Sequence, residues 1–212
     1  MARKSDPISD GDTKSRRDLE PYRLKRNFAL TDEPPGGGDV RPAEALRFVI
    51  QKHAASHLHF DLRLEHRATF KSWAVPKGPS LAPRDRRLAM EVEDHPLDYG
   101  DFEGTIPKGQ YGGGTVMLWD RGYWAPEKGF EDISRALSEG ELKFVMEGER
   151  MHGSWVLVRT RRDQRGRANW ILIKHRDDGA DEDWEGPTDG DRSIASGRTM
   201  AEISAAKAAV VT

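Results

Sequence analysis

Residues 57–65 read HLHFDLRLE, and polar side chains alternate with hydrophobic ones along the whole stretch. The hydrophobic positions are Leu58, Phe60, Leu62 and Leu64, and the polar positions are His57, His59, Asp61, Arg63 and Glu65. Successive side chains of a strand point to opposite faces. The alternation therefore predicts a β-strand with one hydrophobic face and one polar face.

Seven other segments carry the same signal of short or alternating hydrophobic runs. They are LRFVIQ (46–51), FKSWAV (70–75), RLAMEVE (87–93), GTVMLW (114–119), ELKFVM (141–146), SWVLVRT (154–160) and WILIK (170–174). Many short strands with few helices predict an all-β fold. We expect a compact closed or partly open β-barrel of about eight strands with one or two short helices.

Two segments predict those helices. In GFEDISRALSEG (129–140) hydrophobic residues recur at spacings of three and four, and Gly140 can end the helix. A weaker helical pattern is AEISAAKAAVV (201–211). Residues 96–114 contain too much glycine and proline for a helix and predict a long loop, a kind of segment that often carries function in compact domains.

The length of 212 residues suits one domain with flanking segments. The sequence has no cysteine, which excludes disulfides and thiolate metal ligands. It has neither a run of about 18 apolar residues nor the hydrophobic region of a signal peptide. We therefore expect a cytoplasmic protein with no membrane partner.

The formal net charge of -2 hides an uneven distribution. Residues 45–176 have a mild excess of Lys and Arg, whereas residues 177–191 contain carboxylates and no Lys or Arg. We expect a disordered leader (1–18), a folded domain (19–176) and an acidic, disordered tail with a short terminal helix (177–212). Alternatively, the acidic tail mimics nucleic acid and competes for the cationic middle of the chain.

The polar face of the 57–65 strand has two interpretations. It could be an ordinary solvated face, but most histidines of the chain gather in this region, and His53 lies close enough to reach the same point. His53, His59 and Asp61 together suit Mn²⁺, Fe²⁺ or Zn²⁺ with positions left open. Arg63 cannot bind a metal but can clamp a phosphate or carboxylate beside it.

Residues downstream extend this set. Lys77 and Arg87 could neutralise a phosphate, and His95 could donate a proton to a leaving oxygen. Each of these alone is compatible with surface solvation. A rival enzyme class also fits the spacing, because His59-x-Asp61 with distant His152 and Arg162 matches the ligands of an iron and 2-oxoglutarate oxygenase.

The assembled residues resemble a known family, the 3′-phosphoesterase domain of bacterial ligase D, as a free-standing member. The resemblance covers roughly residues 19–176 and includes the spacing between its blocks. These blocks are LEPYRLKRNFALTDEP, FVIQKHAASHLHFDLRLE, KSWAVPKGPS, VEDHPLDYGDFEGTIPKGQYGGGTV and NWILIK.

The resemblance implies a compact β-barrel that binds Mn²⁺ and processes 3′ ends of DNA primer strands in end joining. Such enzymes remove a terminal ribonucleoside and then hydrolyse the resulting 3′-phosphate. It implies a metal site at His53, His59 and Asp61, phosphate contacts from Arg63, His95 and Tyr99, and further functional positions at Lys77, Arg87, Glu93, Arg26 and Glu33.

The expected partners are DNA primer-template ends that carry a 3′-ribonucleotide or 3′-phosphate, and end-joining proteins such as a Ku-type end binder, a polymerase or a ligase. We expect a monomer associated with the nucleoid. One position departs from the family pattern: Asn27 in KRNF (25–28) replaces an acidic residue, which removes a negative charge. This departure leaves a non-catalytic DNA-end binding module as an alternative.

Overall fold

The structure is a computed structural model that describes residues 19–36, 45–162, 168–188 and 190–208. The expected leader at 1–18 lies outside these residues. The strands are β1 (Arg47–Ala54), β2 (Leu58–His66), β3 (Thr69–Val75), β4 (Arg87–Pro96), β5 (Gly104–Ile106), β6 (Gly114–Pro126), β7 (Glu141–Gly148), β8 (His152–Arg162) and β9 (Ala168–Lys174). The helices are α2 (Glu20–Leu24), α3 (Ile133–Glu139), α4 (Met200–Ala208) and the short 3-10 helix η1 (Leu97–Asp101).

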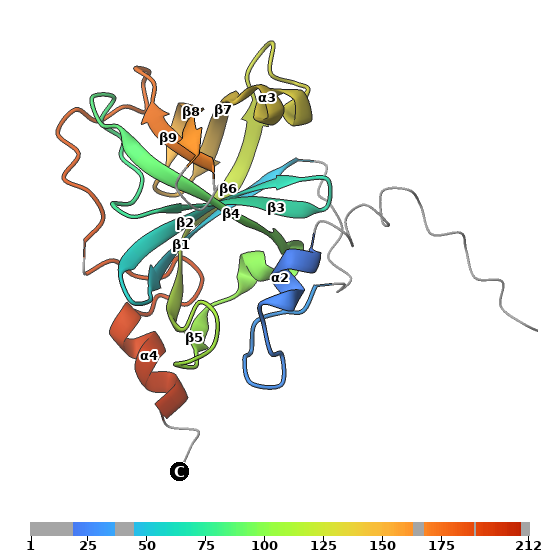
Figure 1. Cartoon of the computed structure of the whole chain (residues 1–212). Helices are drawn as coiled ribbons and strands as arrows, with labels where there is room; N and C mark the ends of the chain where they lie inside the picture. The colour runs from blue at the N-terminus through green and yellow to red at the C-terminus, as the bar shows by residue number, and fades with distance from the viewer. Residues whose placement is uncertain (1–18, 37–44, 163–167, 189, 209–212) are drawn as a thin grey trace, which may run out of the picture.

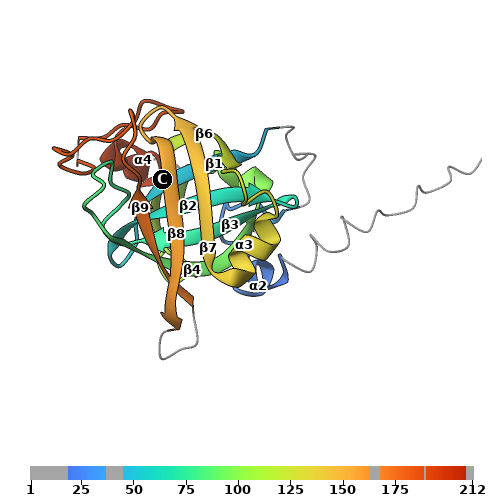
Figure 2. The same ribbon diagram turned by 90° about the horizontal axis from the view of Figure 1, so that it is seen from above.

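Eight of these strands close into an antiparallel barrel. The strand order is β1-β2-β3-β4-β9-β8-β7-β6-β5, and a second pairing of β6 with β1 closes the ring (Figure 1). Closure removes unpaired strand edges. Figure 2 shows β9, β8 and β7 side by side across one wall of the barrel. The expected all-β barrel is confirmed, and all eight segments expected to be strands form the ring.

The long loop at 96–114 contains more structure than the sequence predicts. It holds η1 and the three-residue strand β5, which pairs with β6 outside the barrel. Such short elements give too few residues for a hydrophobic period to be recognised. The expected helix near 129–140 is confirmed as α3, where the Asp132 side chain accepts a hydrogen bond from Arg135 N and Gly140 adopts the left-handed conformation at the end.

Two hydrophobic clusters lie on opposite sides of the barrel wall. The larger one fills the interior and includes Trp73, Trp119, Trp155 and Trp170. The smaller one contains Tyr22 of α2, Tyr99 of η1, Phe102, Ile106 and Val116. Figure 1 shows α2 and β5 outside the ring, on the same side of it. Val116 belongs to β6, so this outer cluster covers part of the outer face of the barrel wall.

The acidic segment after β9 returns to the barrel. Its composition predicts disorder, but in its described part Trp119 Nε1 donates a 2.6 Å hydrogen bond to Asp191, and Ile194 N donates to Leu118 O at 3.0 Å. The segment ends in α4, which contacts β5 and β6. The expected disorder of residues 177–212 stays a prediction. In the described part of the segment, carboxylates find donors both nearby and far away in the chain, since Asp177 bonds Lys174 and Asp191 bonds Trp119 on β6. Among the described residues, no helix combines the length and hydrophobicity needed to cross a membrane.

Candidate metal and phosphate site

The polar face of β2 meets a second histidine from β1. The antiparallel register sets His53 directly opposite His59, and Gln51 opposite Asp61. Arg63 follows two residues further along the same face of β2. The alternation seen in the sequence therefore gathers two imidazoles, a carboxylate and a guanidinium on one patch of the barrel wall.

Most of this polar face is buried, although His57 at its start is exposed and His59 is partly exposed. Asp61, Arg63 and Glu65 are 6%, 2% and 0% exposed. The Arg63 guanidinium lies 4.8 Å from the ring centroid of Tyr99 in the outer cluster. Gln51 links the two layers because its Nε2 donates to Tyr99 O at 3.1 Å and to Phe102 O at 2.9 Å. Buried charged groups need partners. These side chains therefore form a site of mutually bonded charged groups, which the polar face of an ordinary water-facing strand does not have.

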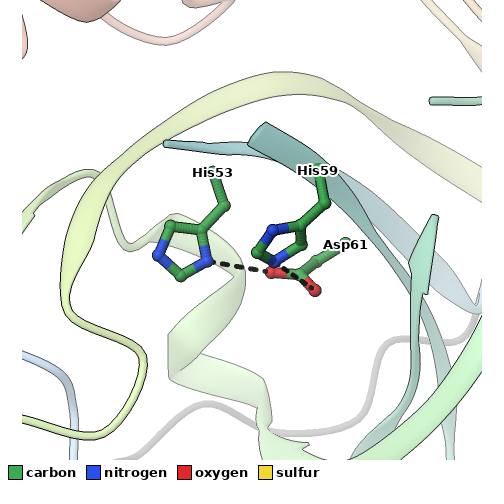
Figure 3. A group of neighbouring side chains, drawn as sticks. All are labelled: His53, His59 and Asp61. Atoms are coloured by element: carbon green, nitrogen blue, oxygen red, sulfur yellow. Dashed lines mark ion pairs between the residues drawn. The ribbon is translucent and has the colours of Figure 1, made fainter. Parts of the chain in front are cut away.

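His53, His59 and Asp61 form a compact group of potential metal ligands (Figure 3). One ligand atom from each residue lies within 4.8 Å of the others. The Asp61 carboxylate is 3.6 Å from His53 Nδ1 and 3.7 Å from His59 Nε2. Two imidazoles and one carboxylate suit a divalent transition metal with open coordination positions.

Backbone carbonyl groups orient both imidazoles for such a role. His53 Nε2 lies 2.9 Å from Gly112 O, and His59 Nδ1 lies 3.0 Å from His57 O. A carbonyl oxygen can only accept, so these two nitrogens carry the protons. In the neutral rings, the lone pairs of His53 Nδ1 and His59 Nε2 are then on the side of Asp61. Histidines that bind a metal are arranged in this way, with one ring nitrogen free for the metal and the other donating a hydrogen bond. The residues present fit a bound divalent metal.

Asp61 stays ionised in this environment. Burial raises the pKa of its carboxyl group, but the Arg63 guanidinium lowers it, and the net pKa lies well below the usual range. Arg63 NH2 is 3.2 Å from the carboxylate. Its other nitrogens donate to Gln51 Oε1 at 2.7 Å and to Ser72 Oγ at 2.9 Å, which fixes the guanidinium under the ligand group.

His95 is held as a neutral imidazole. Its Nδ1 lies 2.9 Å from Glu93 O, and its Nε2 lies 3.3 Å from Arg26 NH2. These contacts make Nδ1 the donor and Nε2 the acceptor. Burial lowers the pKa of His95, the charges of Arg63 and Arg26 lower it further, and the pKa lies well below its usual range. In this state Nε2 is a base, so the expected role as a proton donor requires an added negative charge.

Arg26 and Glu33 come from the N-terminal segment and contact the residues around His95. Arg26 Nε donates to Glu33 Oε1 at 2.8 Å, and its guanidinium lies 3.8 Å from the ring centroid of Tyr22. The Tyr99 hydroxyl donates to the same Glu33 oxygen at 3.2 Å, and burial raises the pKa of Tyr99. Glu33 therefore fixes both Arg26 and Tyr99 beside His95.

Glu93 lies at the rim of the site. It accepts hydrogen bonds from Lys25 Nζ at 2.9 Å, Arg26 NH1 at 3.1 Å and the Tyr111 hydroxyl at 3.3 Å. Burial raises the pKa of Glu93, but the bonds to these cations lower it more, so the carboxylate is ionised. Glu93 thus links α2, β4 and the loop before β6.

The ligand group, Arg63, His95 and Tyr99 line one pocket of about 190 Å³. Of the residues singled out from the sequence, its lining contains His53, His59, Asp61, Arg63, His95, Tyr99, Glu93 and Arg26. Glu33 lies directly behind it. The sequence analysis misses Gln51, Ser72, Gly112 and Tyr111, because their roles depend on contacts with segments distant in sequence.

Lys77 and Arg87 differ from the others, because the described lining of this pocket does not include them. Lys77 is exposed after the end of β3. Arg87 pairs with the core residue Leu172 across β4 and β9, so its side chain begins on the interior face, where it donates to Asp85 Oδ2 at 2.7 Å. The expected catalytic roles of both residues stay predictions without support from the pocket geometry.

Two other positions bear on the alternatives. Asn27 is exposed, and its Oδ1 accepts a 3.2 Å hydrogen bond from Ala29 N, a bond that an aspartate could also make. The missing charge is therefore on the surface and not in the pocket. His152, the third ligand of the oxygenase alternative, begins β8, whereas the described ligand group contains His53. The side chain of Arg162 lies outside the described residues.

Known proteins with similar sequences come from one family. The family model described as the DNA Ligase D 3′-phosphoesterase domain matches residues 51–159. The multifunctional non-homologous end joining protein LigD of Pseudomonas aeruginosa is 49% identical over 165 residues, which make up 77% of this chain and 19% of the relative. LigD of Mycolicibacterium smegmatis is 37% identical over 162 residues, covering 75% of this chain and 21% of the relative.

A third relative, LigD of Mycobacterium tuberculosis, is 39% identical over 146 residues, covering 69% of this chain and 19% of its own length. The chain therefore spans about a fifth of the length of these curated relatives. The family match contains the ligand group, Arg63, His95 and Tyr99, whereas Arg26 and Glu33 precede it.

Proposed function

The chain belongs to the family of the DNA ligase D 3′-phosphoesterase domain, and we propose that it is a metal-dependent hydrolase that processes 3′ ends of DNA during non-homologous end joining. The proposed reactions are removal of a 3′-terminal ribonucleoside from a primer strand and hydrolysis of the remaining 3′-phosphate. The proposed metal is Mn²⁺. The relatives are named for non-homologous end joining, which supports this setting. In it the protein would act in the cytoplasm, at the nucleoid, together with other end-joining proteins.

The observation that carries the proposal is the arrangement of proton donors and lone pairs in one pocket. His53 and His59 direct unprotonated nitrogens to the Asp61 side, and the pocket also contains Arg63 and His95. A metal held by His53, His59 and Asp61 would act as a Lewis acid toward a phosphate oxygen. A binding site for an anion alone would not need the ionised carboxylate of Asp61, which repels phosphate.

The cationic residues provide the complementary charge for a phosphate. Arg63 is fixed by Gln51, Ser72 and Asp61, so its position is set before the substrate arrives. Such preorganised charge stabilises a transition state in which negative charge grows on the phosphoryl oxygens. Arg26 is fixed in the same way by two carboxylates, Glu33 and Glu93.

His95 gains its function when a phosphate enters. The dianion of a phosphomonoester adds negative charge beside an imidazole whose pKa burial and two guanidinium groups keep low. This raises the pKa of His95, and a proton taken up at Nε2 is available for the departing 3′ oxygen. In the hydrolysis of the 3′-phosphate a water oxygen bonds to phosphorus and the bond from phosphorus to the 3′ oxygen breaks. The 3′ oxygen takes the proton from His95 Nε2 and leaves as a hydroxyl, and the hydrogens of the attacking water leave with inorganic phosphate.

The test follows a 5′-labelled primer with one terminal ribonucleotide, annealed to a longer template, on a sequencing gel. We expect conversion to a 3′-phosphate and then to a 3′-hydroxyl with Mn²⁺, and no conversion with EDTA or with Asp61→Ala. Asp178→Ala, which removes an exposed carboxylate outside the pocket, serves as the matched control. Turnover by Asp61→Ala at the wild-type rate would refute the metal site. Binding of 3′-phosphate ends without turnover under any divalent metal would favour the binding-module alternative.

A further inference from the structure

A larger cavity adjoins the pocket that contains His53, His59 and Asp61, which we call the metal pocket. It has a volume of about 580 Å³ and shares Val92, Glu93 and Tyr111 with the 190 Å³ pocket. Sites for organic ligands usually have volumes of roughly 300–1,000 Å³. The metal pocket therefore suits a phosphate group, and the sugar and base attached to that phosphate require the adjoining cavity.

Tyr111 lies on the border between these two cavities. It belongs to the loop between β5 and β6, and it is 45% exposed. The same loop contributes Gly112, whose carbonyl oxygen orients the metal-ligand candidate His53. The exposed Tyr111 ring is therefore the sequence neighbour of Gly112, whose carbonyl group orients His53.

The ring is held at its hydroxyl group and by two cations over its plane, since the Arg26 guanidinium also lies 5.3 Å from the ring centroid. Lys25 Nζ lies 3.2 Å from the Tyr111 hydroxyl and 4.8 Å from the ring centroid, and the hydroxyl donates to Glu93. The loop itself is closed by hydrogen bonds from Gln110 N to Pro107 O and from Gly113 N to Gln110 O. A ring fixed before binding loses little conformational entropy when a ligand stacks on it.

We propose that Tyr111 is a stacking platform for a nucleobase of the DNA strand whose 3′ end occupies the metal pocket. This inference rests on the proposed function and adds the position of the nucleotide that carries the reacting phosphate. Exposed aromatic rings stack on bases without regard to sequence. The hydroxyl group positions the ring, and the ring contacts the base.

The larger cavity would hold the DNA strand that carries the reacting phosphate, and not the departing nucleoside. Its lining includes Lys25, Lys71, Arg159 and the hydroxyl groups of Ser72, Ser134 and Ser138. Two of these cations are paired with carboxylates of the same lining, Lys25 with Glu93 and Lys71 with Asp94, and Glu91 accepts from Trp170. Arg159 donates to the carbonyl oxygens of Leu137 and Ser138, and these uncharged acceptors do not neutralise its charge. A DNA strand continues with further phosphates that cations and hydroxyls can contact, whereas a departing nucleoside has none. Tyr111 therefore contacts a nucleotide that is present in both proposed reactions.

The test uses the full chain and a primer-template whose 3′-terminal nucleotide is 2-aminopurine with a 3′-phosphate. Base stacking quenches 2-aminopurine fluorescence, and binding in EDTA separates stacking from turnover. Kinetics with Mn²⁺ then compare a 3′-phosphate substrate with a 3′-ribonucleoside substrate. The variants are Tyr111→Ala, Tyr111→Phe and the matched control Tyr123→Ala, since Tyr123 is 56% exposed on β6 and lines a different cavity.

We expect Tyr111→Ala to lose the quenching, to bind roughly tenfold more weakly and to raise KM for both substrates with little change in kcat. Tyr111→Phe keeps the ring and should retain most of the affinity, and Tyr123→Ala should behave as the wild type. Equal effects of Phe and Ala at Tyr111 would overturn the proposal, because they would show a role of the hydroxyl alone. A defect confined to the ribonucleoside substrate would also overturn it. If the wild-type protein quenches 2-aminopurine fluorescence but shows no turnover, the proposed function is rejected and the proposed stacking role of Tyr111 is retained.

Discussion

Replacing Asp61 with asparagine tests the electrostatic balance at the centre of the site. The change preserves shape and removes one negative charge. Arg63 is then left 2% exposed without the carboxylate that lies 3.2 Å from its NH2 atom. Removing one partner of a buried ion pair costs about 3–5 kcal/mol. Because Arg63 keeps its bonds to Gln51 and Ser72, we expect the low end, a loss of roughly 3 kcal/mol in the free energy of unfolding.

The assay is urea unfolding of the metal-free protein in EDTA at pH 7.5, with tryptophan fluorescence as the signal. Asp94→Asn is the matched control, since Asp94 pairs with Lys71 at 2.6 Å on the partly exposed rim. Partly exposed pairs contribute about 1 kcal/mol or less. A second series with saturating Mn²⁺ should stabilise the wild type and the control by about 2.7 kcal/mol when the metal is at 100 times its Kd, and should leave Asp61→Asn almost unchanged.

The difference between the wild type and Asp61→Asn should also depend on pH. The folded-state pKa of Asp61 lies below that of the unfolded chain, so its contribution is complete above the unfolded pKa near 4 and is lost as the pH falls through the folded-state value. An Asp61→Asn variant within 1 kcal/mol of the wild type, or one with undiminished stabilisation by Mn²⁺, would refute this account of the site.

Three further predictions concern other parts of the molecule. Asp191→Ala should lower the free energy of unfolding by about 1–3 kcal/mol, because Asp191 accepts from Trp119 and lies 4.0 Å from the buried Lys52 ammonium; unchanged urea unfolding and unchanged proteolysis of the segment after β9 would contradict it. Gly122→Ala should cost about 2–3 kcal/mol, since the new Cβ would lie 1.9 Å from a backbone oxygen of β7; wild-type thermal stability would argue against this packing. His95→Gln should flatten the pH dependence of stability, because a lowered folded-state pKa makes the wild type lose stability as the pH falls below about 6.5; identical urea midpoints for both proteins from pH 7.5 to 5 would exclude it.

Much of the fold follows directly from local pattern. The period of two in residues 57–65 predicts β2, and similar runs predict the other seven barrel strands. The same alternation identifies His59, Asp61 and Arg63 as neighbours on one face. The short elements α2, η1 and β5 escape prediction because three to five residues carry no detectable period.

The acidic segment shows what composition leaves out. Residues 177–191 contain carboxylates and no Lys or Arg, a composition typical of disorder. In the structure Asp191 instead bonds the indole of Trp119 on β6, far away in the chain. Arg87 shows the reverse, because a cation expected at the site begins on the interior face of β4.

The sequence by itself determined the strands, the polar face of β2 and the ligand types at His53, His59 and Asp61, because side-chain alternation is a property of consecutive residues. Only the tertiary structure decided that this face is covered, that Arg26 reaches His95, and that Gly112 orients His53. These contacts join segments separated by many residues, and they exist only once the barrel closes and the N-terminal segment and the 96–114 loop pack against its outer wall. Burial then sets the protonation states of Asp61 and His95, because the energy of a charge depends on the atoms around it in space and not on its neighbours in sequence.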